Sequence, residues 1–122
     1  MKIPDIKGGA AFQTDKSLEE AGEIISKKLF GGLEFQGKEL SIYEEVPAIF
    51  IKNQILGLSV ILNGYSGYGE DERFILEIRV PYFNDIFGNN VESYKYDISK
   101  YLEGLLEDCF KEDKTVKILK SK

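Results

Sequence analysis

The sequence predicts an α+β fold, a two-layer sandwich in which a mainly antiparallel sheet carries two helices on one face. Residues 56–62 and 73–80 alternate apolar and polar side chains, as strands with one buried face do. The stretches that begin near residues 17 and 97 repeat apolar residues at spacings of three and four, as amphipathic helices do. A chain of 122 residues, 43% of them hydrophobic, can bury one core but is too short for two ordinary domains. We therefore expect a single domain spanning residues 1–122.

The first helix is expected to begin at Ser17, because Ser17 and Glu20 are spaced as in a capping box. Its apolar stripe consists of Leu18, Ala21, Ile25 and Leu29. The polar residues expected to face away from the core are Glu19, Glu23 and Lys27. Gly31 and Gly32 should end this helix, since glycine readily adopts the left-handed conformation found at helix ends.

Residues 38–63 are expected to form strands, with Leu40 and Ile42 alternating with polar neighbours and 48–51 forming a short apolar run. The side chains expected on one face are Leu56, Leu58, Val60 and Leu62, then Phe74, Leu76, Ile78 and Val80. Ser59 and Asn63 should point the other way, with Ile75 as an exception to the alternation. This alternation predicts an antiparallel sheet with one buried and one wet face, and Pro81 should mark a strand end.

Asp97 is expected to cap a second helix. The apolar positions of this helix are Ile98, Tyr101, Leu102, Leu105 and Cys109. Residues 91–96 fit either an extension of that helix or a strand, and 115–119 should form a short final strand. The predicted order is therefore one helix, three or four strands, a second helix and a last strand.

The composition argues against several classes of function. The net charge of −5 disfavours nucleic-acid binding, although five lysines make the last twelve residues basic. The chain has no histidine, the side chain most often used for proton transfer and metal binding, so we expect no catalytic residues, cofactor or metal. Cys109, the single cysteine, has no histidine to activate it and is expected to be a buried core residue. No run approaches the roughly 18 apolar residues of a membrane span, and the start does not resemble a signal peptide, so we expect a cytoplasmic protein that contacts no membrane.

The segment from Tyr65 to Glu72 has the composition of a protein-binding surface. It places the aromatic residues Tyr65 and Tyr68 beside the acids Glu70, Asp71 and Glu72. Tyrosine provides a large contact area at low entropic cost, and clustered carboxylates attract a basic partner. The same pairing recurs at Tyr43, Glu44 and Glu45, and at Tyr82 and Asp85. If the three segments meet at one edge of the sheet, they form an acidic, tyrosine-bearing patch.

Two other binding functions are disfavoured for this segment. Its glycines lack the lysine and serine that end a phosphate-binding loop, and its consecutive acids lack the spacing of a calcium loop. A solvated acidic turn between two strands would also explain its composition.

Residues 45–51, Glu-Val-Pro-Ala-Ile-Phe-Ile, followed by Leu56-Gly-Leu58 and the run to Tyr65, resemble small immunity proteins of bacterial polymorphic and contact-dependent growth inhibition toxin systems. The likeness covers roughly residues 29–83. It implies a cytoplasmic, non-enzymatic protein that binds a cognate toxin domain, often a nuclease, and blocks it. These proteins are diverse in sequence and fold, so the resemblance assigns no binding residue. The alternatives are a small metabolite-binding domain or enzyme, and a structural adaptor subunit.

Overall fold

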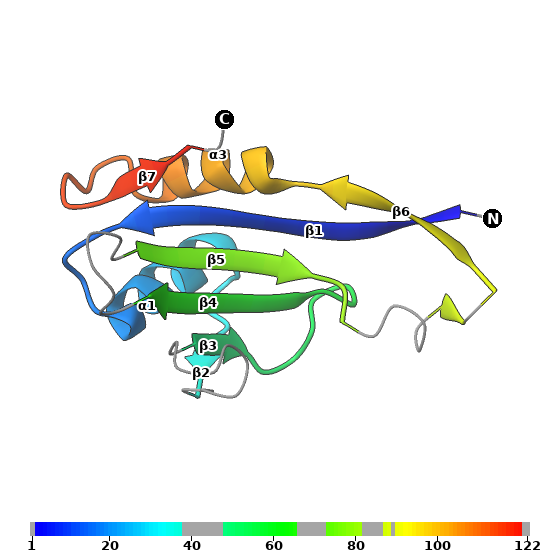
Figure 1. Ribbon diagram of the computed structural model, residues 1–122. Coiled ribbons are helices and arrows are strands. Elements are labelled where there is room, and N and C mark those ends of the chain that lie inside the picture. The colour runs from blue at the N-terminus through cyan, green and yellow to red at the C-terminus, as the bar shows by residue number, and fades with distance from the viewer. Residues whose placement is uncertain (1, 38–47, 66–72, 82–86, 89, 121–122) are drawn as a thin grey trace.

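A strand that the sequence pattern did not predict, β1 (Lys2–Gln13), lies inside the sheet and pairs with three other strands. The computed structural model describes residues 2–37, 48–65, 73–81, 87–88 and 90–120. Within these ranges, one sheet has the strand order β2-β3-β4-β5-β1-β6, and β7 also pairs with β1 (Figure 1). The other elements are α1 (Leu18–Leu29), β2 (Phe35–Gln36), β3 (Ala48–Ile51), β4 (Ser59–Tyr65), β5 (Arg73–Arg79), β6 (Glu92–Asp97), α3 (Ser99–Cys109) and β7 (Lys117–Leu119).

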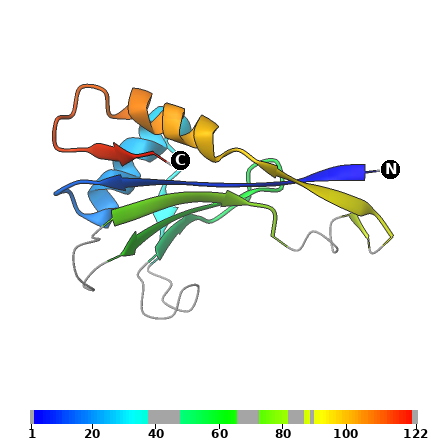
Figure 2. The same ribbon diagram turned by 45° about the horizontal axis from the view of Figure 1, so that its top comes forward.

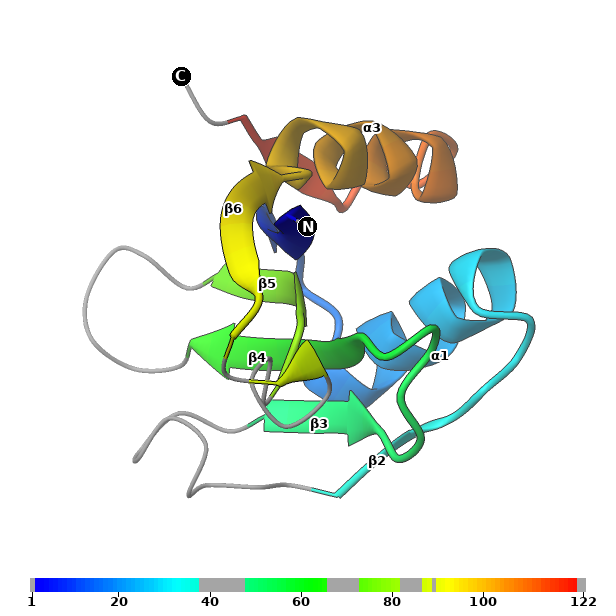
Figure 3. The same ribbon diagram turned by 90° about the vertical axis from the view of Figure 1, so that its right-hand side faces the viewer.

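The predicted α+β class with a mainly antiparallel sheet is confirmed. Every strand pair in the described chain is antiparallel except β1 with β6, which is parallel. Seen along the strands, α1 and α3 lie on the same face of the sheet (Figure 3). Residues 91–96, for which the sequence pattern fitted either a helix or a strand, belong largely to strand β6. Strand β6 and the N-terminal half of β1 extend together past the other strands (Figures 1 and 2).

The core lies between this sheet face and the two helices. Most of the predicted core residues are buried, including Val60, Leu62, Leu76, Ile78, Leu18, Ile25 and Leu102. Leu58, Phe74, Leu29 and Leu105 are partly buried and pack against this cluster. Strand β1 adds Ala10 and Phe12, which were missing from the prediction.

Helix α1 has the predicted start and end. The Ser17 hydroxyl accepts a hydrogen bond from the Glu20 amide at 3.1 Å, and the Glu20 carboxylate accepts one from the Ser17 amide at 3.2 Å. Gly31 and Gly32 follow the helix with φ of 62° and 88°. Such angles are costly for side chains with a Cβ, which explains why glycine stands there.

Two predictions about β4 are wrong. Leu56 is 96% exposed with φ of 53°, because Ile55 and Leu58 close a tight turn around it by reciprocal backbone hydrogen bonds of 2.9 Å. The strand therefore starts only at Ser59. Its second face is also not wet, because Ile61 and Asn63 are only 4% and 7% exposed.

The second helix differs from its predicted apolar stripe at two positions. Tyr101 is 65% exposed, and Leu106 is fully buried. The buried side of α3 follows Leu102, Leu106 and Cys109, spacings of four and three that place Tyr101 outside the stripe. Asp97 lies one residue before the formal cap, Ile98, and its carboxylate accepts a hydrogen bond from the Ser99 amide at 2.8 Å.

The close approach of α3 to β1 requires glycine at position 8. A Cβ at Gly8 would lie 2.8 Å from Ile98 Cγ1 and 3.1 Å from the Ile98 carbonyl carbon, whereas a Cβ at Gly9 would meet nothing closer than 3.7 Å. We expect Gly8→Ala to lower the free energy of unfolding by about 1–3 kcal/mol, because the helix must shift. Urea titration of this variant beside Gly9→Ala measures the effect. Equal stability of the two variants would contradict the close packing.

The connection between α3 and β7 contains an acid-sensitive ion pair. Hydrogen bonds from the Thr115 hydroxyl and amide, together with Lys16 at 3.0 Å, lower the pKa of Asp113 from 3.8 to about 2. A carboxylate whose folded pKa is depressed contributes stability above its unfolded pKa and loses it as the pH falls toward the folded pKa. We therefore expect wild-type stability to fall between pH 3.8 and about 2 more steeply than that of Asp113→Asn. Urea titrations of both proteins across this pH range test the expectation. If the free energy of unfolding changes equally with pH in both proteins, Asp113 contributes nothing to the pH dependence.

Candidate partner-binding site

The predicted patch falls almost entirely outside the residues that the structure describes. Only the backbone of Tyr65, the last residue of β4, is placed. The remaining members are Tyr43, Glu44, Glu45, Tyr68, Glu70, Asp71, Glu72, Tyr82 and Asp85. Their role therefore stays a prediction, and the structure contributes the positions of the strands that lead into each segment.

The chain ends that flank the first two acidic segments lie at one end of the sheet. Ala48, which follows the segment containing Tyr43–Glu45, pairs with Asn63 near the end of β4. Tyr65 and Arg73, which flank the segment 66–72, pair with each other. Arg79, which precedes the third segment, pairs instead with Ser59 at the opposite end of β4. The strand register therefore favours a shared site for the first two segments and gives no such support for the third.

The acidic first turn of α1 lies at the same end of the sheet. A Cβ at Gly64 would be 3.4 Å from Leu18 Cδ1, so the start of α1 packs over the end of β4. Glu19 and Glu20 belong to this first turn. Carboxylates near a helix N-terminus interact favourably with the helix dipole, so these charges have a local structural role as well.

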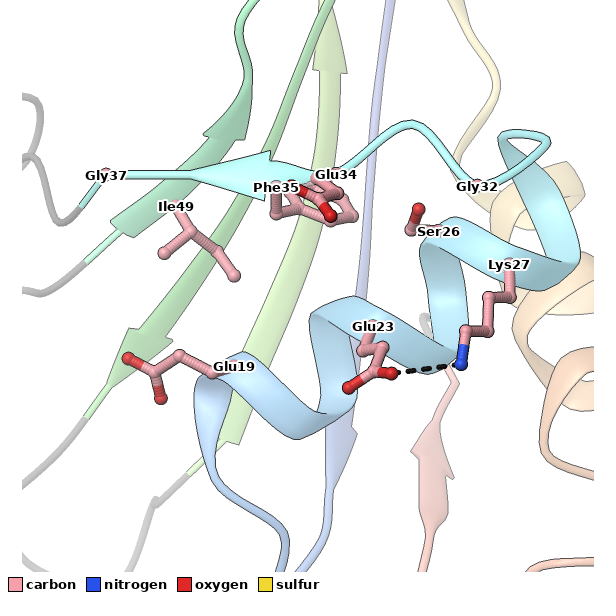
Figure 4. A pocket seen from close by; sticks show the side chains of 9 residues that line it. All are labelled: Glu19, Glu23, Ser26, Lys27, Gly32, Glu34, Phe35, Gly37 and Ile49. Carbon is pink, nitrogen blue, oxygen red and sulfur yellow. Dashed lines mark hydrogen bonds and ion pairs between the residues drawn. The ribbon is translucent and has the colours of Figure 1, made fainter.

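A groove runs from this acidic turn along α1. It has a volume of about 490 Å³ and lies between α1 and the chain around β2 (Figure 4). One wall carries Glu19, Glu23 and Lys27, which are four residues apart on the helix and therefore share a face. The other wall carries Glu34 and Phe35, and Ile49 of β3 also lines the groove.

Two internal contacts lie along the walls of the groove. The Ser26 hydroxyl donates a hydrogen bond of 2.5 Å to the Leu33 carbonyl, which ties the segment after α1 to the helix. Lys27 Nζ lies 2.9 Å from a Glu23 carboxylate oxygen. Three carboxylates and one ammonium group make the groove acidic.

The helical wall of this groove was predictable from the sequence pattern. Glu19, Glu23 and Lys27 were expected to face away from the core, and all three are exposed. Their spacing of four was the available signal. The opposite wall was not predictable in this way, because Glu34 and Phe35 reach the helix through the turn at Gly31–Gly32 and the pairing of Phe35 with Ile51.

Cys109 is buried, and this burial raises the pKa of its thiol above its ordinary value. Lys28 Nζ donates a hydrogen bond of 2.6 Å to the Cys109 carbonyl and so links the ends of the two helices. A thiol of this kind is a weak nucleophile, which agrees with the predicted core position.

In the described part of the chain, the cysteine and the acidic side chains form no group of three or more that could hold a metal ion. None of its helices has the length and apolarity needed to cross a membrane.

Comparison with known proteins leaves the chain without an assigned relative: no protein family, no curated protein and no solved structure matches it.

Proposed function

We propose that this protein is an immunity protein that binds and neutralises a cognate bacterial toxin domain in the cytoplasm. The contact surface is the acidic end of the sheet, formed by the tyrosine-bearing segments 43–45 and 65–72 and the first turn of α1. The observation that carries the proposal is the strand register, which brings the chain ends flanking both segments together beside Glu19 and Glu20. The resemblance of residues 29–83 to immunity proteins supports the same assignment.

Charge complementarity supports this function. A nuclease site must be electropositive to hold phosphate groups, and an acidic protein surface can occupy such a site by presenting similar charge. Aromatic side chains in the same surface add desolvated contact area, and they commonly dominate the binding energy of an interface. The protein therefore acts by occupying the toxin, and it catalyses no reaction of its own.

The two residue types should affect different rate constants of binding. We expect Tyr68→Ala mainly to raise the dissociation rate, since aromatic anchors govern how long a complex lasts. We expect Glu70→Gln, Asp71→Asn and Glu72→Gln together to lower the association rate by about tenfold or more at low salt, because steering depends on long-range charge. The difference should shrink at high salt, since exposed charges are screened over about 8 Å at physiological ionic strength.

The proposal predicts a toxin gene beside the gene for this protein, and surface plasmon resonance with the domain of that toxin measures both rates. A matched control, Asp5→Asn with Glu92→Gln, removes charge at the opposite end of the sheet, where β1 pairs with β6. This control should leave the association rate nearly unchanged. If the control slows association as much as the triple variant does, the charge effect is not local and the acidic end is not the contact surface.

A further inference from the structure

We propose that the outer edge of strand β6 pairs with the same edge of a second copy of this chain, so that the two sheets join into one. Strand β6 stands last in the strand order, and within the described residues it pairs with β1 alone. All six of its residues are exposed. This edge lies at the end of the sheet opposite the acidic end, so the inference does not rest on the proposed function.

Strand β6 and the N-terminal half of β1 form a two-stranded ribbon that gains little support from the other described strands. Strand β5 pairs with β1 only over residues 7–12, whereas β6 pairs with residues 2–7. The ribbon therefore extends past the rest of the sheet (Figures 1 and 2). Isolated pairs of strands are marginally stable, and parallel strands are usually well covered. A third strand on the outer edge of β6 gives the ribbon the support that a pair lacks.

The backbone of β6 is oriented to accept such a strand. Ile98 N–H donates a hydrogen bond of 2.8 Å to the Lys7 carbonyl, and Lys7 is the register partner of Asp97. The amide of residue 98 therefore points toward β1. Backbone groups alternate in direction along a strand, so those of Ser93 and Lys95 point away from β1, toward the open edge. An open edge of this kind is a template for pairing with another chain.

Two-fold symmetry and charge select one register for the pair. A two-fold axis perpendicular to the sheet makes the two β6 strands antiparallel and passes beside one residue, which then lies opposite its own copy. An axis at Tyr94 pairs residues 92–96 of both copies, an axis at Lys95 pairs residues 93–97, and every other axis pairs a shorter stretch. The axis at Lys95 places two ammonium groups directly opposite each other, which is unfavourable. The register centred on Tyr94 is therefore preferred.

In this register, strand β6 is complementary to itself. Tyr94 faces its own copy in a pair without backbone hydrogen bonds, the type in which side chains lie closest, and aromatic cross-strand pairs are stabilising. Glu92 lies opposite Tyr96, whose hydroxyl can donate to the carboxylate. Lys95 lies opposite Ser93, so no like charges face each other within residues 92–96. The pairing also covers Tyr94 and Tyr96, which are 46% and 56% exposed in the single chain.

The first test measures self-association of the whole protein by sedimentation equilibrium. Because the contact is smaller than the roughly 1,200 Å² of stable complexes, we expect a dissociation constant on the order of 100 µM. Tyr94→Lys and Tyr94→Glu each place like charges at the two-fold axis and should raise this constant about tenfold or more. An equimolar mixture of the two variants places lysine opposite glutamate and should restore association to within about threefold of the wild type.

The matched controls are Leu33→Lys and Leu33→Glu. They introduce the same charges at an exposed leucine near β2, the strand at the other end of the strand order, and should associate as the wild type does. A protein that stays monomeric at every concentration overturns the inference. It is also overturned if the Tyr94 variants associate as the wild type does, or if two folded variants regain no association when mixed.

Hydrogen exchange of the wild-type protein tests the backbone pairing without any substitution. The amides of Ser93 and Lys95 should exchange about twofold more slowly at the concentration where half of the chains are paired, because exchange is blocked in the paired half. The Tyr94 amide points toward β1, so its exchange should not depend on concentration. If the exchange of Ser93 and Lys95 is equally independent of concentration, the strands do not pair, even where a Tyr94 variant fails to fold.

Discussion

Replacing Phe12 with alanine is expected to lower the free energy of unfolding by about 3–5 kcal/mol. Phe12 is fully buried in strand β1, and its ring packs edge-on against Phe74 at 5.6 Å and tilted against Phe110 at 5.5 Å. The substitution removes both aromatic contacts and leaves a cavity between the sheet and the end of α3. Since domains of this size are stable by roughly 5–15 kcal/mol, such a loss would bring the protein near unfolding.

Tyr101→Ala provides the control for this prediction. It also removes an aromatic ring, but from a side chain that is mostly exposed on α3. Its stability should change by no more than about 0.5 kcal/mol, as is usual for surface positions. Urea titrations of both variants test the pair, and a larger loss from Tyr101→Ala than from Phe12→Ala would contradict the assignment of the core.

Replacing Leu76 with alanine is expected to cost about 2–5 kcal/mol. Leu76 is fully buried at the centre of the sheet, where it lies between Ala10 of β1 and Leu62 of β4. Close neighbours on both strands limit how far the site can collapse, and the cost of a cavity increases when collapse is limited.

The matched control is Leu56→Ala, the same chemical change at a leucine that is almost fully exposed. The sequence pattern places Leu56 and Leu76 in the same core, whereas the structure separates them, so this pair compares the two directly. We expect Leu56→Ala to change stability by less than about 0.5 kcal/mol. Chemical denaturation that gives similar losses for both leucines would show that the turn at Leu56 is packed in solution.

The helices and the central strands were predictable because their signals are local. The Ser17–Glu20 capping box, the spacing of Leu18, Ala21 and Ile25, and the two glycines after α1 each act within a few residues. The alternation in β5 likewise reflects one buried face of a strand. These features require no knowledge of distant parts of the chain.

Strand β1 was not predictable in this way, although it contacts more strands than any other described element. Its sequence includes Pro4, Gly8 and Gly9, residues that are disfavoured in strands. The pairing with β5 and β6 and the close packing of α3 on Gly8 outweigh this low local preference. These contacts depend on residues about 60 to 90 positions away in the sequence, so no local pattern contains them.

The same distinction between local signals and distant contacts applies to the candidate site. The exposed acidic face of α1 was predictable from helical spacing, and the acidic segments were visible in the composition. Only the register of β3, β4 and β5 shows that the chain ends flanking two of these segments meet beside the start of α1. The groove depends in addition on the return of the chain from α1 to β2.

The proposed function requires the acidic end of the sheet to contact the toxin. In the decisive experiment, the neighbouring toxin domain is co-expressed with the wild-type protein, with a variant or with a control, and bacterial growth is followed. The variant carries Glu70→Gln, Asp71→Asn, Glu72→Gln and Tyr68→Ala, and the control carries Asp5→Asn and Glu92→Gln. Binding of the purified proteins to the toxin domain is measured in parallel. We predict that the wild type and the control bind the toxin and protect growth, and that the variant loses both. A wild-type protein that neither binds the toxin nor protects growth would contradict the proposed function, and full protection by the variant would place the interface elsewhere.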